Sequence, residues 1–109
     1  MKIRAKFTKK DELRYISHLD LMRLFQRAFR RANIPVKYSE GYNPHPQFSL
    51  ATALALGVSS DGEYMDVELG SYIEPEDFKQ KLNTILPNGI KILKAVSTDD
   101  KESIVSLIR

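Results

Sequence analysis

The segment from Ser17 to Asn33, SHLDLMRLFQRAFRRAN, constrains the fold more than any other part of the chain. Its apolar residues recur at about 100° per residue, the period of a helix with one buried face. These residues are Leu21, Met22, Phe25, Ala28, Phe29 and Ala32. Ser17 can cap the first turn with Asp20 at the capping-box position, and Pro35 disfavours helical backbone at the residue before it. The pattern therefore predicts one amphipathic helix over residues 17–33.

The rest of the chain alternates between strand-like and helix-like patterns. Strands are predicted at residues 1–8, 36–39, 63–69 and 90–96, and a second helix at 74–86. The order βαββαβ predicts an α+β, ferredoxin-like fold, in which an antiparallel sheet carries both helices on one face. The segment FSLATALAL, residues 48–56, is an extra apolar segment after the second strand, and its period does not distinguish a strand from a helix.

Length and composition limit the class of protein. The 109 residues are enough for one domain with one hydrophobic core. The chain has no cysteine, which excludes disulfides, thiolate metal sites and a cysteine nucleophile. No apolar run approaches the roughly 18 residues of a membrane-spanning helix, and the N-terminus lacks the apolar core of a signal peptide. We therefore expect a single cytoplasmic domain over residues 1–109, with no membrane partner and no cofactor in this chain.

Charge is distributed unevenly along the sequence. Residues 1–47 carry 11 Lys/Arg and 4 Asp/Glu, a net charge of +7, whereas residues 48–109 carry 6 Lys/Arg and 10 Asp/Glu, a net charge of −4. Four arginines lie on the helix face opposite the apolar stripe or at its edge: Arg23, Arg27, Arg30 and Arg31. Guanidinium groups bind phosphates by forked hydrogen bonds. This face either meets an acidic partner such as RNA or is neutralised by the acidic half of the chain.

The stretch SEGYNPHP, residues 39–46, has the composition of a stiff loop. Two X-Pro bonds restrict the backbone on both sides of His45, and Gly41 permits a conformation closed to other residues. The loop either sets a strand register or contacts a ligand, as loops on rigid scaffolds often do. Its candidate contact residues are Glu40, Gly41, Tyr42, Asn43 and His45.

The two histidines admit several roles. His18, near the start of the helix, lies by angle on the apolar side, so it is either a hydrogen-bonded residue at the edge of the core or a proton-transfer group. A carboxylate such as Asp20 or Glu40 could complete a metal site, but no metal-ligand spacing supports one. His18 and His45 could also serve as acid and base in a metal-independent RNA-cleaving enzyme.

The segment from Arg14 to Leu69 resembles a bacterial family of unknown function, the radical SAM-linked or radical SAM-associated proteins. The motifs YISHLDLMR, RAFRRANIPV and YSEGYNPHP carry the resemblance. Members are similar to a small stand-alone protein or to a domain attached after a radical SAM enzyme. The resemblance implies a partner role beside such an enzyme, in the N-terminal portion of a longer family domain. It implies no catalysis here, because the three-cysteine cluster motif is absent.

These observations favour a non-catalytic accessory domain that binds RNA, either tRNA or rRNA, and presents it to a radical SAM enzyme. The four arginines of the helix would hold phosphates. Tyr42, Asn43 and His45 would contact a base or the partner. The alternative is a protein-interaction domain that docks the same partner through the same helix and loop without RNA.

Overall fold

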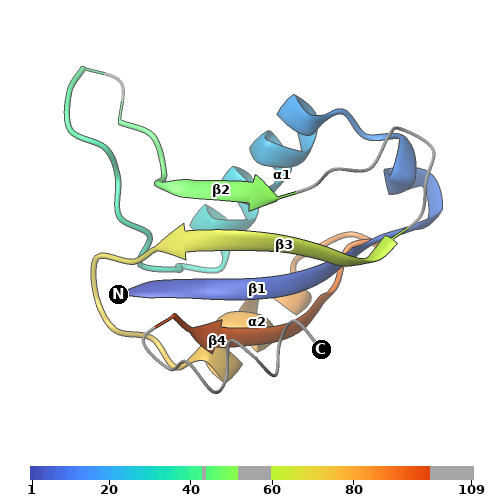
Figure 1. Ribbon diagram of the computed structural model, residues 1–109. Helices are drawn as coiled ribbons and strands as arrows, with labels where there is room; N and C mark the ends of the chain where they lie inside the picture. The colour runs from blue at the N-terminus through green and yellow to red at the C-terminus, as the bar shows by residue number, and fades with distance from the viewer. Residues whose placement is uncertain (43, 52–59, 99–109) are drawn as a thin grey trace.

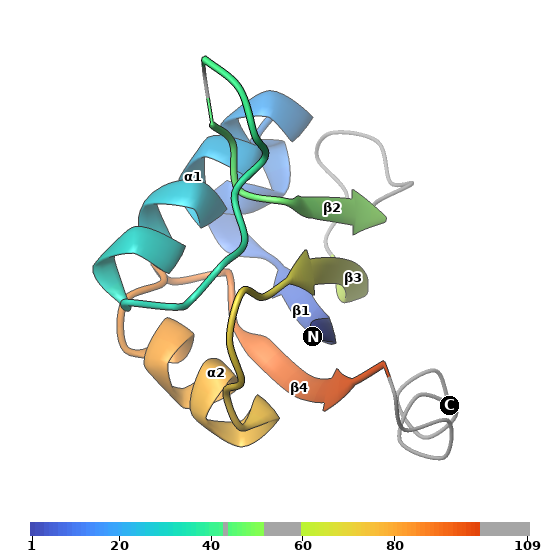
Figure 2. The same ribbon diagram turned by 90° about the vertical axis from the view of Figure 1, so that its left-hand side faces the viewer.

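A four-stranded antiparallel sheet forms one layer of the molecule, and two helices cover one of its faces (Figures 1 and 2). The computed structural model describes residues 1–42, 44–51 and 60–98. Its elements are β1 (Lys2–Lys9), the 3₁₀-helix η1 (Asp11–Tyr15), α1 (His18–Arg31), β2 (Phe48–Ala51), β3 (Ser60–Glu68), α2 (Pro75–Asn83) and β4 (Ile92–Ser97). The strands lie in the order β2-β3-β1-β4. The predicted α+β fold with the βαββαβ order of elements is confirmed.

The position of the second strand differs from the sequence-based expectation. Residues 36–39 make only isolated bridges, and the second strand is β2, at the start of the apolar segment 48–56 that we expected to be an extra one. Packing explains the difference, because β2 places the Phe48 ring 5.1 Å from the Phe29 ring of α1. The remainder of that segment, residues 52–56, lies outside the described residues.

The hydrophobic core lies between the sheet and the helices. The predicted alternation of β1 and β3 is confirmed, since the buried residues of these strands include Ile3, Ala5, Phe7, Met65 and Val67. Phe7 of β1 meets Phe25 of α1 at 5.1 Å, which joins the sheet to the helical layer, and Phe29 of α1 meets Phe78 of α2 at 6.2 Å, which joins the two helices. Aromatic side chains bury large areas and prefer such offset contacts, so these pairs position both helices on the sheet.

Helix α1 begins and ends where the sequence predicts. The backbone N–H of Asp20 donates to Ser17 Oγ at 3.1 Å, which caps the first turn. After the last turn, Asn33 has a φ of 55°, the left-handed conformation that commonly ends helices. In the described part of the chain, neither α1 nor any other helix is long and apolar enough to cross a membrane.

Candidate nucleic-acid interface

Four arginines lie on the side of α1 that faces solvent. Arg23, Arg27, Arg30 and Arg31 are all exposed, as expected, because the opposite side of the helix is buried against the sheet. Residues four apart on a helix are neighbours, with Cβ atoms about 5–6 Å apart. Arg27 and Arg31 are such a pair. A row of guanidinium groups on one helix face can bind successive phosphates of a nucleic-acid chain.

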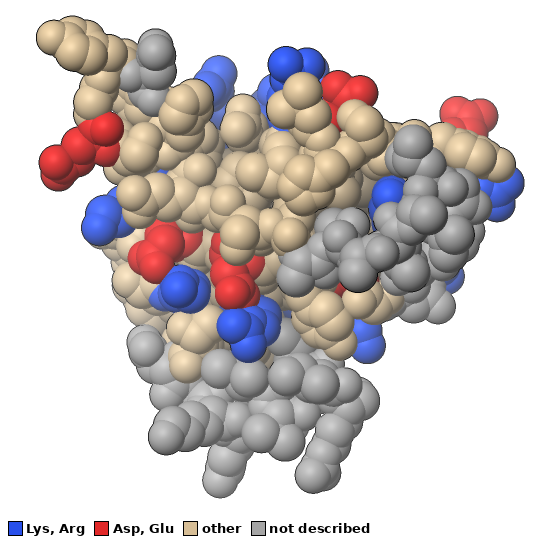
Figure 3. Space-filling view, turned by 45° about the horizontal axis from the view of Figure 1, so that its top comes forward, with Lys and Arg blue, Asp and Glu red and all other residues tan. Residues whose placement is uncertain are grey.

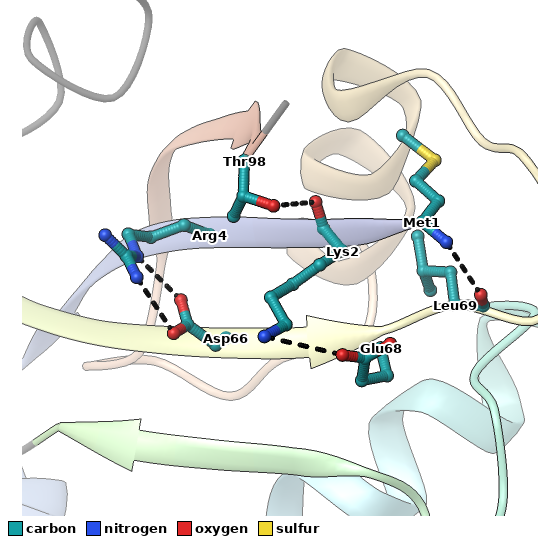
Figure 4. A network of polar contacts seen from close by, with 7 residues as sticks. All are labelled: Met1, Lys2, Arg4, Asp66, Glu68, Leu69 and Thr98. Atoms are coloured by element: carbon teal, nitrogen blue, oxygen red, sulfur yellow. Dashed lines mark hydrogen bonds and ion pairs between the residues drawn. The ribbon is translucent and has the colours of Figure 1, made fainter. Parts of the chain in front are cut away.

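Two acidic residues of β3, Asp66 and Glu68, are paired with β1 rather than with α1. Arg4 donates two hydrogen bonds to Asp66, and Lys2 Nζ lies 3.4 Å from Glu68 Oε1 (Figure 4). Basic and acidic side chains stand next to one another on this face in Figure 3. The hydrogen bond from Arg4 to Asp66, followed by the charge of that carboxylate, raises the pKa of Arg4. Asp66 and Glu68 are therefore paired on the open face of the sheet, which also carries Lys6 beside Lys94.

In the part of the chain that the structure describes, the arginines of α1 have no comparable partners. Arg23 Nη1 lies 3.7 Å from Asp20 Oδ1 within the same helix, and both side chains are 61% exposed, so this pair is weak. Over residues 1–42, 44–51 and 60–98, no ion pair involves Arg27, Arg30 or Arg31. Among the described residues, the arginine face thus keeps an excess of positive charge.

The loop of residues 39–45 is closed at its base by hydrogen bonds. The N–H of Ser39 donates to the carbonyl of His45 at 2.8 Å, and the N–H of His45 donates to Ser39 Oγ at 3.0 Å. One step further, the N–H of Gln47 donates to the carbonyl of Lys37 at 2.8 Å. The loop projects beyond the start of β2 (Figure 1). These bonds hold its two ends together although it packs little against the core.

The tip of the loop presents its side chains to solvent. Tyr42 is fully exposed, and Glu40, Gly41 and His45 are exposed as well. Gly41 has a φ of 123°, and nothing lies within 4 Å of the position that a Cβ would take. Its backbone conformation, rather than lack of space, is what requires glycine. The predicted contact residue Asn43 lies outside the described residues.

The structure does not bring His18 and His45 together. His18 begins α1 and His45 lies in the loop before β2, and within the described regions no hydrogen bond or ion pair joins their side chains. His18 is exposed, so the expectation of a histidine at the edge of the core is wrong. The first turn of α1 extends past the core: Leu19 is 58% exposed, and burial begins at Leu21. No group of three His, Asp or Glu side chains in the described regions could hold a metal ion.

A groove between α1 and the segment that follows α2, residues 85–87, did not emerge from the sequence. It has a volume of about 240 Å³ and is lined by Leu24, Arg27, Ala28, Arg31, Ile85, Leu86 and Pro87. The only sequence signal is the position of Leu24, between the apolar stripe and the arginines on the helical wheel. That position does not reveal what lies opposite, because the second wall comes from a segment about 60 residues later in the chain.

Comparison with known proteins gives one match. The model of a family described as "Uncharacterized protein conserved in bacteria (DUF2344)" matches residues 2–109. No curated protein and no solved structure matches the chain. The description of the family names no activity, ligand or partner, so the functional argument depends on the geometry of α1 and of the loop.

Proposed function

We propose that this chain, which belongs to the DUF2344 family of proteins conserved in bacteria, is a non-catalytic accessory domain that binds RNA beside a radical SAM enzyme. The observation that carries the proposal is the arginine face of α1. Its four guanidinium groups are exposed, and within the described regions no acidic residue of the second half of the chain pairs with them. RNA phosphates bind such a row and release counterions. The radical SAM partner, with tRNA or rRNA as the substrate class, is proposed from the sequence resemblance.

The loop of residues 39–45 supplies the second contact in this proposal. The Tyr42 ring is fully exposed and can stack on an unpaired base, while the exposed imidazole of His45 can exchange hydrogen bonds with it. The open face of the sheet is unsuited to the same role, because Asp66 and Glu68 lie there and already pair with cations of β1. RNA therefore contacts the helical layer and the loop.

Salt-dependent binding tests the proposal. If four phosphates contact arginines, affinity for single-stranded RNA should fall about 50-fold between about 50 and 200 mM salt. The variant Arg27→Glu/Arg30→Glu/Arg31→Glu should lose binding and retain its fold. The matched control, Lys81→Glu/Lys91→Glu/Lys94→Glu, makes the same charge change at three exposed lysines elsewhere and should retain most of its affinity. No binding by the wild type at low salt, or equal loss in both variants, would refute the arginine face as an RNA site.

A second candidate function is docking of the radical SAM enzyme without RNA. The full exposure of Tyr42 favours it, since large aromatic side chains are enriched among the residues that dominate protein interfaces. A pull-down with the purified partner after ribonuclease treatment separates the two functions. Retention that depends on Tyr42 and persists at high salt would support docking, whereas retention only in the presence of RNA would support the first proposal.

A further inference from the structure

We infer that the groove between α1 and residues 85–87 receives one unpaired nucleotide of the bound RNA. Its base would lie on the apolar floor, and its flanking phosphates would bind Arg27 and Arg31. The inference rests on the proposed RNA-binding function and specifies what the arginine face selects, which is single-stranded RNA rather than a duplex. Three observations support this inference: the groove has an apolar floor, its rim is cationic, and the hollow beside it is acidic.

The floor of the groove is apolar and accessible. Leu24 and Ala28 form the α1 side, and Ile85 and Leu86 form the opposite side. Ala28 is 4% exposed, whereas the other three side chains are only partly buried. The volume of about 240 Å³ is smaller than a typical cofactor or drug site, so the groove suits a single planar group rather than a larger ligand. A base placed here would remove apolar surface from water.

The rim of the groove is cationic on its α1 side. Arg27 and Arg31 both line it, one helical turn apart, and both are exposed. No acidic side chain in the described part of the chain pairs with either one. Two guanidinium groups above an apolar floor are complementary to a flat, weakly polar ring that carries an anionic group on each side. An unpaired nucleotide within an RNA strand has this chemistry, whereas a duplex keeps its bases stacked inside.

The surface next to the groove indicates the path that the RNA strand would take. A hollow of about 500 Å³ shares Pro87 with the groove, and Asp11 and Glu12 line it together with Leu13 and Asn88. Carboxylates repel the phosphates of RNA, so the strand would not continue into this hollow. It would instead follow α1 past the exposed side chains of Arg23 and Arg30.

Binding of two RNA forms tests the inference. The ligands are an oligouridine of about ten nucleotides and an RNA duplex of the same length, titrated against wild type, Leu24→Gln and Leu19→Gln. Leu19 lies on the same helix, is 58% exposed and does not line the groove, so it is the matched control. We expect Leu24→Gln to lower oligouridine affinity about tenfold and to leave duplex affinity and the salt slope unchanged. Leu19→Gln should change none of these quantities.

The outcomes separate this inference from the proposed function. If the wild type binds RNA and Leu24→Gln binds oligouridine equally well, the groove assignment is wrong and the arginine face remains an RNA site. If the wild type binds no RNA, both are wrong. Because Leu24 is partly buried, backbone amide NMR of the wild type provides a test without substitution. Oligouridine should shift the amides of residues 24–31 and of Ile85 and Leu86, and saturable shifts confined to other regions would overturn the assignment.

Discussion

Arg4 of β1 donates two hydrogen bonds to the carboxylate of Asp66, the residue directly opposite it on β3. Arg4 Nε lies 2.7 Å from Asp66 Oδ1, and Arg4 Nη2 lies 3.1 Å from Oδ2. This forked geometry matches the planar guanidinium to the planar carboxylate. Because Asp66 and Glu68 pair with β1, they do not neutralise the arginines of α1.

We expect Asp66→Ala to lower the free energy of unfolding by about 1 kcal/mol, a modest value because solvent screens a pair that is about one-third exposed. Glu68→Ala is the control, since its single 3.4 Å contact with Lys2 is worth only roughly 0.3 kcal/mol. Urea unfolding measures both changes. Equal losses would mean that the forked geometry of the Arg4 pair adds no stability.

The hydrogen bond from the His45 N–H to Ser39 Oγ should hold the loop closed. We expect Ser39→Ala to accelerate hydrogen exchange at the His45 amide about fivefold, which corresponds to about 1 kcal/mol for one hydrogen bond. RNA affinity should fall as well, because the contacts at the tip would be less well ordered before binding. Ser71→Ala, at an exposed serine outside the loop, controls for a general effect. Unchanged hydrogen exchange at the His45 amide would show that this hydrogen bond does not hold the loop closed.

Tyr42 contributes binding energy and no stability if the proposal is correct. We expect Tyr42→Ala to weaken RNA binding about tenfold, the range found for loss of one stacked base, and to leave the unfolding free energy unchanged because the ring is fully exposed. Tyr72→Ala removes another exposed ring, 69% accessible, and should not affect binding. Equilibrium binding and urea unfolding of the two variants provide the check. Similar RNA affinities for the two variants would count against a contact at the loop tip.

Each arginine of α1 that binds a phosphate should contribute to the salt dependence of binding. We expect Arg30→Gln to reduce the slope of log affinity against log salt by about 0.7 for single-stranded RNA. Lys81→Gln, which neutralises an exposed cation on α2, should leave the slope unchanged. Titrations at several salt concentrations determine both slopes. A slope unaffected by Arg30→Gln would remove Arg30 from the interface while leaving the other arginines to be tested.

Glu63 is a buried carboxylate, and one of its oxygen atoms accepts no hydrogen bond from the described residues. It is 2% exposed and lies opposite Phe7 across the strand pair, and no hydrogen-bond partner for its Oε1 is found among the described residues. We expect Glu63→Gln to raise the free energy of unfolding by about 1 kcal/mol near neutral pH, because an amide costs less to bury than a charge. Glu40→Gln, at an exposed position, is the control for urea unfolding. Destabilisation by Glu63→Gln would show that the carboxylate has a stabilising partner in solution.

Periodic patterns were sufficient to predict α1, β1 and β3, because each buries one face over many residues. They were insufficient for the second strand. Residues 36–39 and 48–51 are both short, and only the contact of Phe48 with Phe29 shows why the later segment joins the sheet. Within the candidate site, the exposure of the arginines followed from the helical period. The hydrogen bonds between Ser39 and His45 depend on chain reversal in the loop, which has no periodic pattern.

The sequence by itself determined that α1 has an apolar face and an arginine face, because a 3.6-residue period separates these side chains whatever the helix packs against. Only the tertiary structure determined which charged side chains pair with one another and which line the groove. The pairing of Asp66 with Arg4 depends on β3 lying beside β1, and the groove beside Arg27 depends on residues 85–87 lying near α1. Both relationships join residues far apart in the chain, so they arise from strand order and helix packing rather than from local pattern.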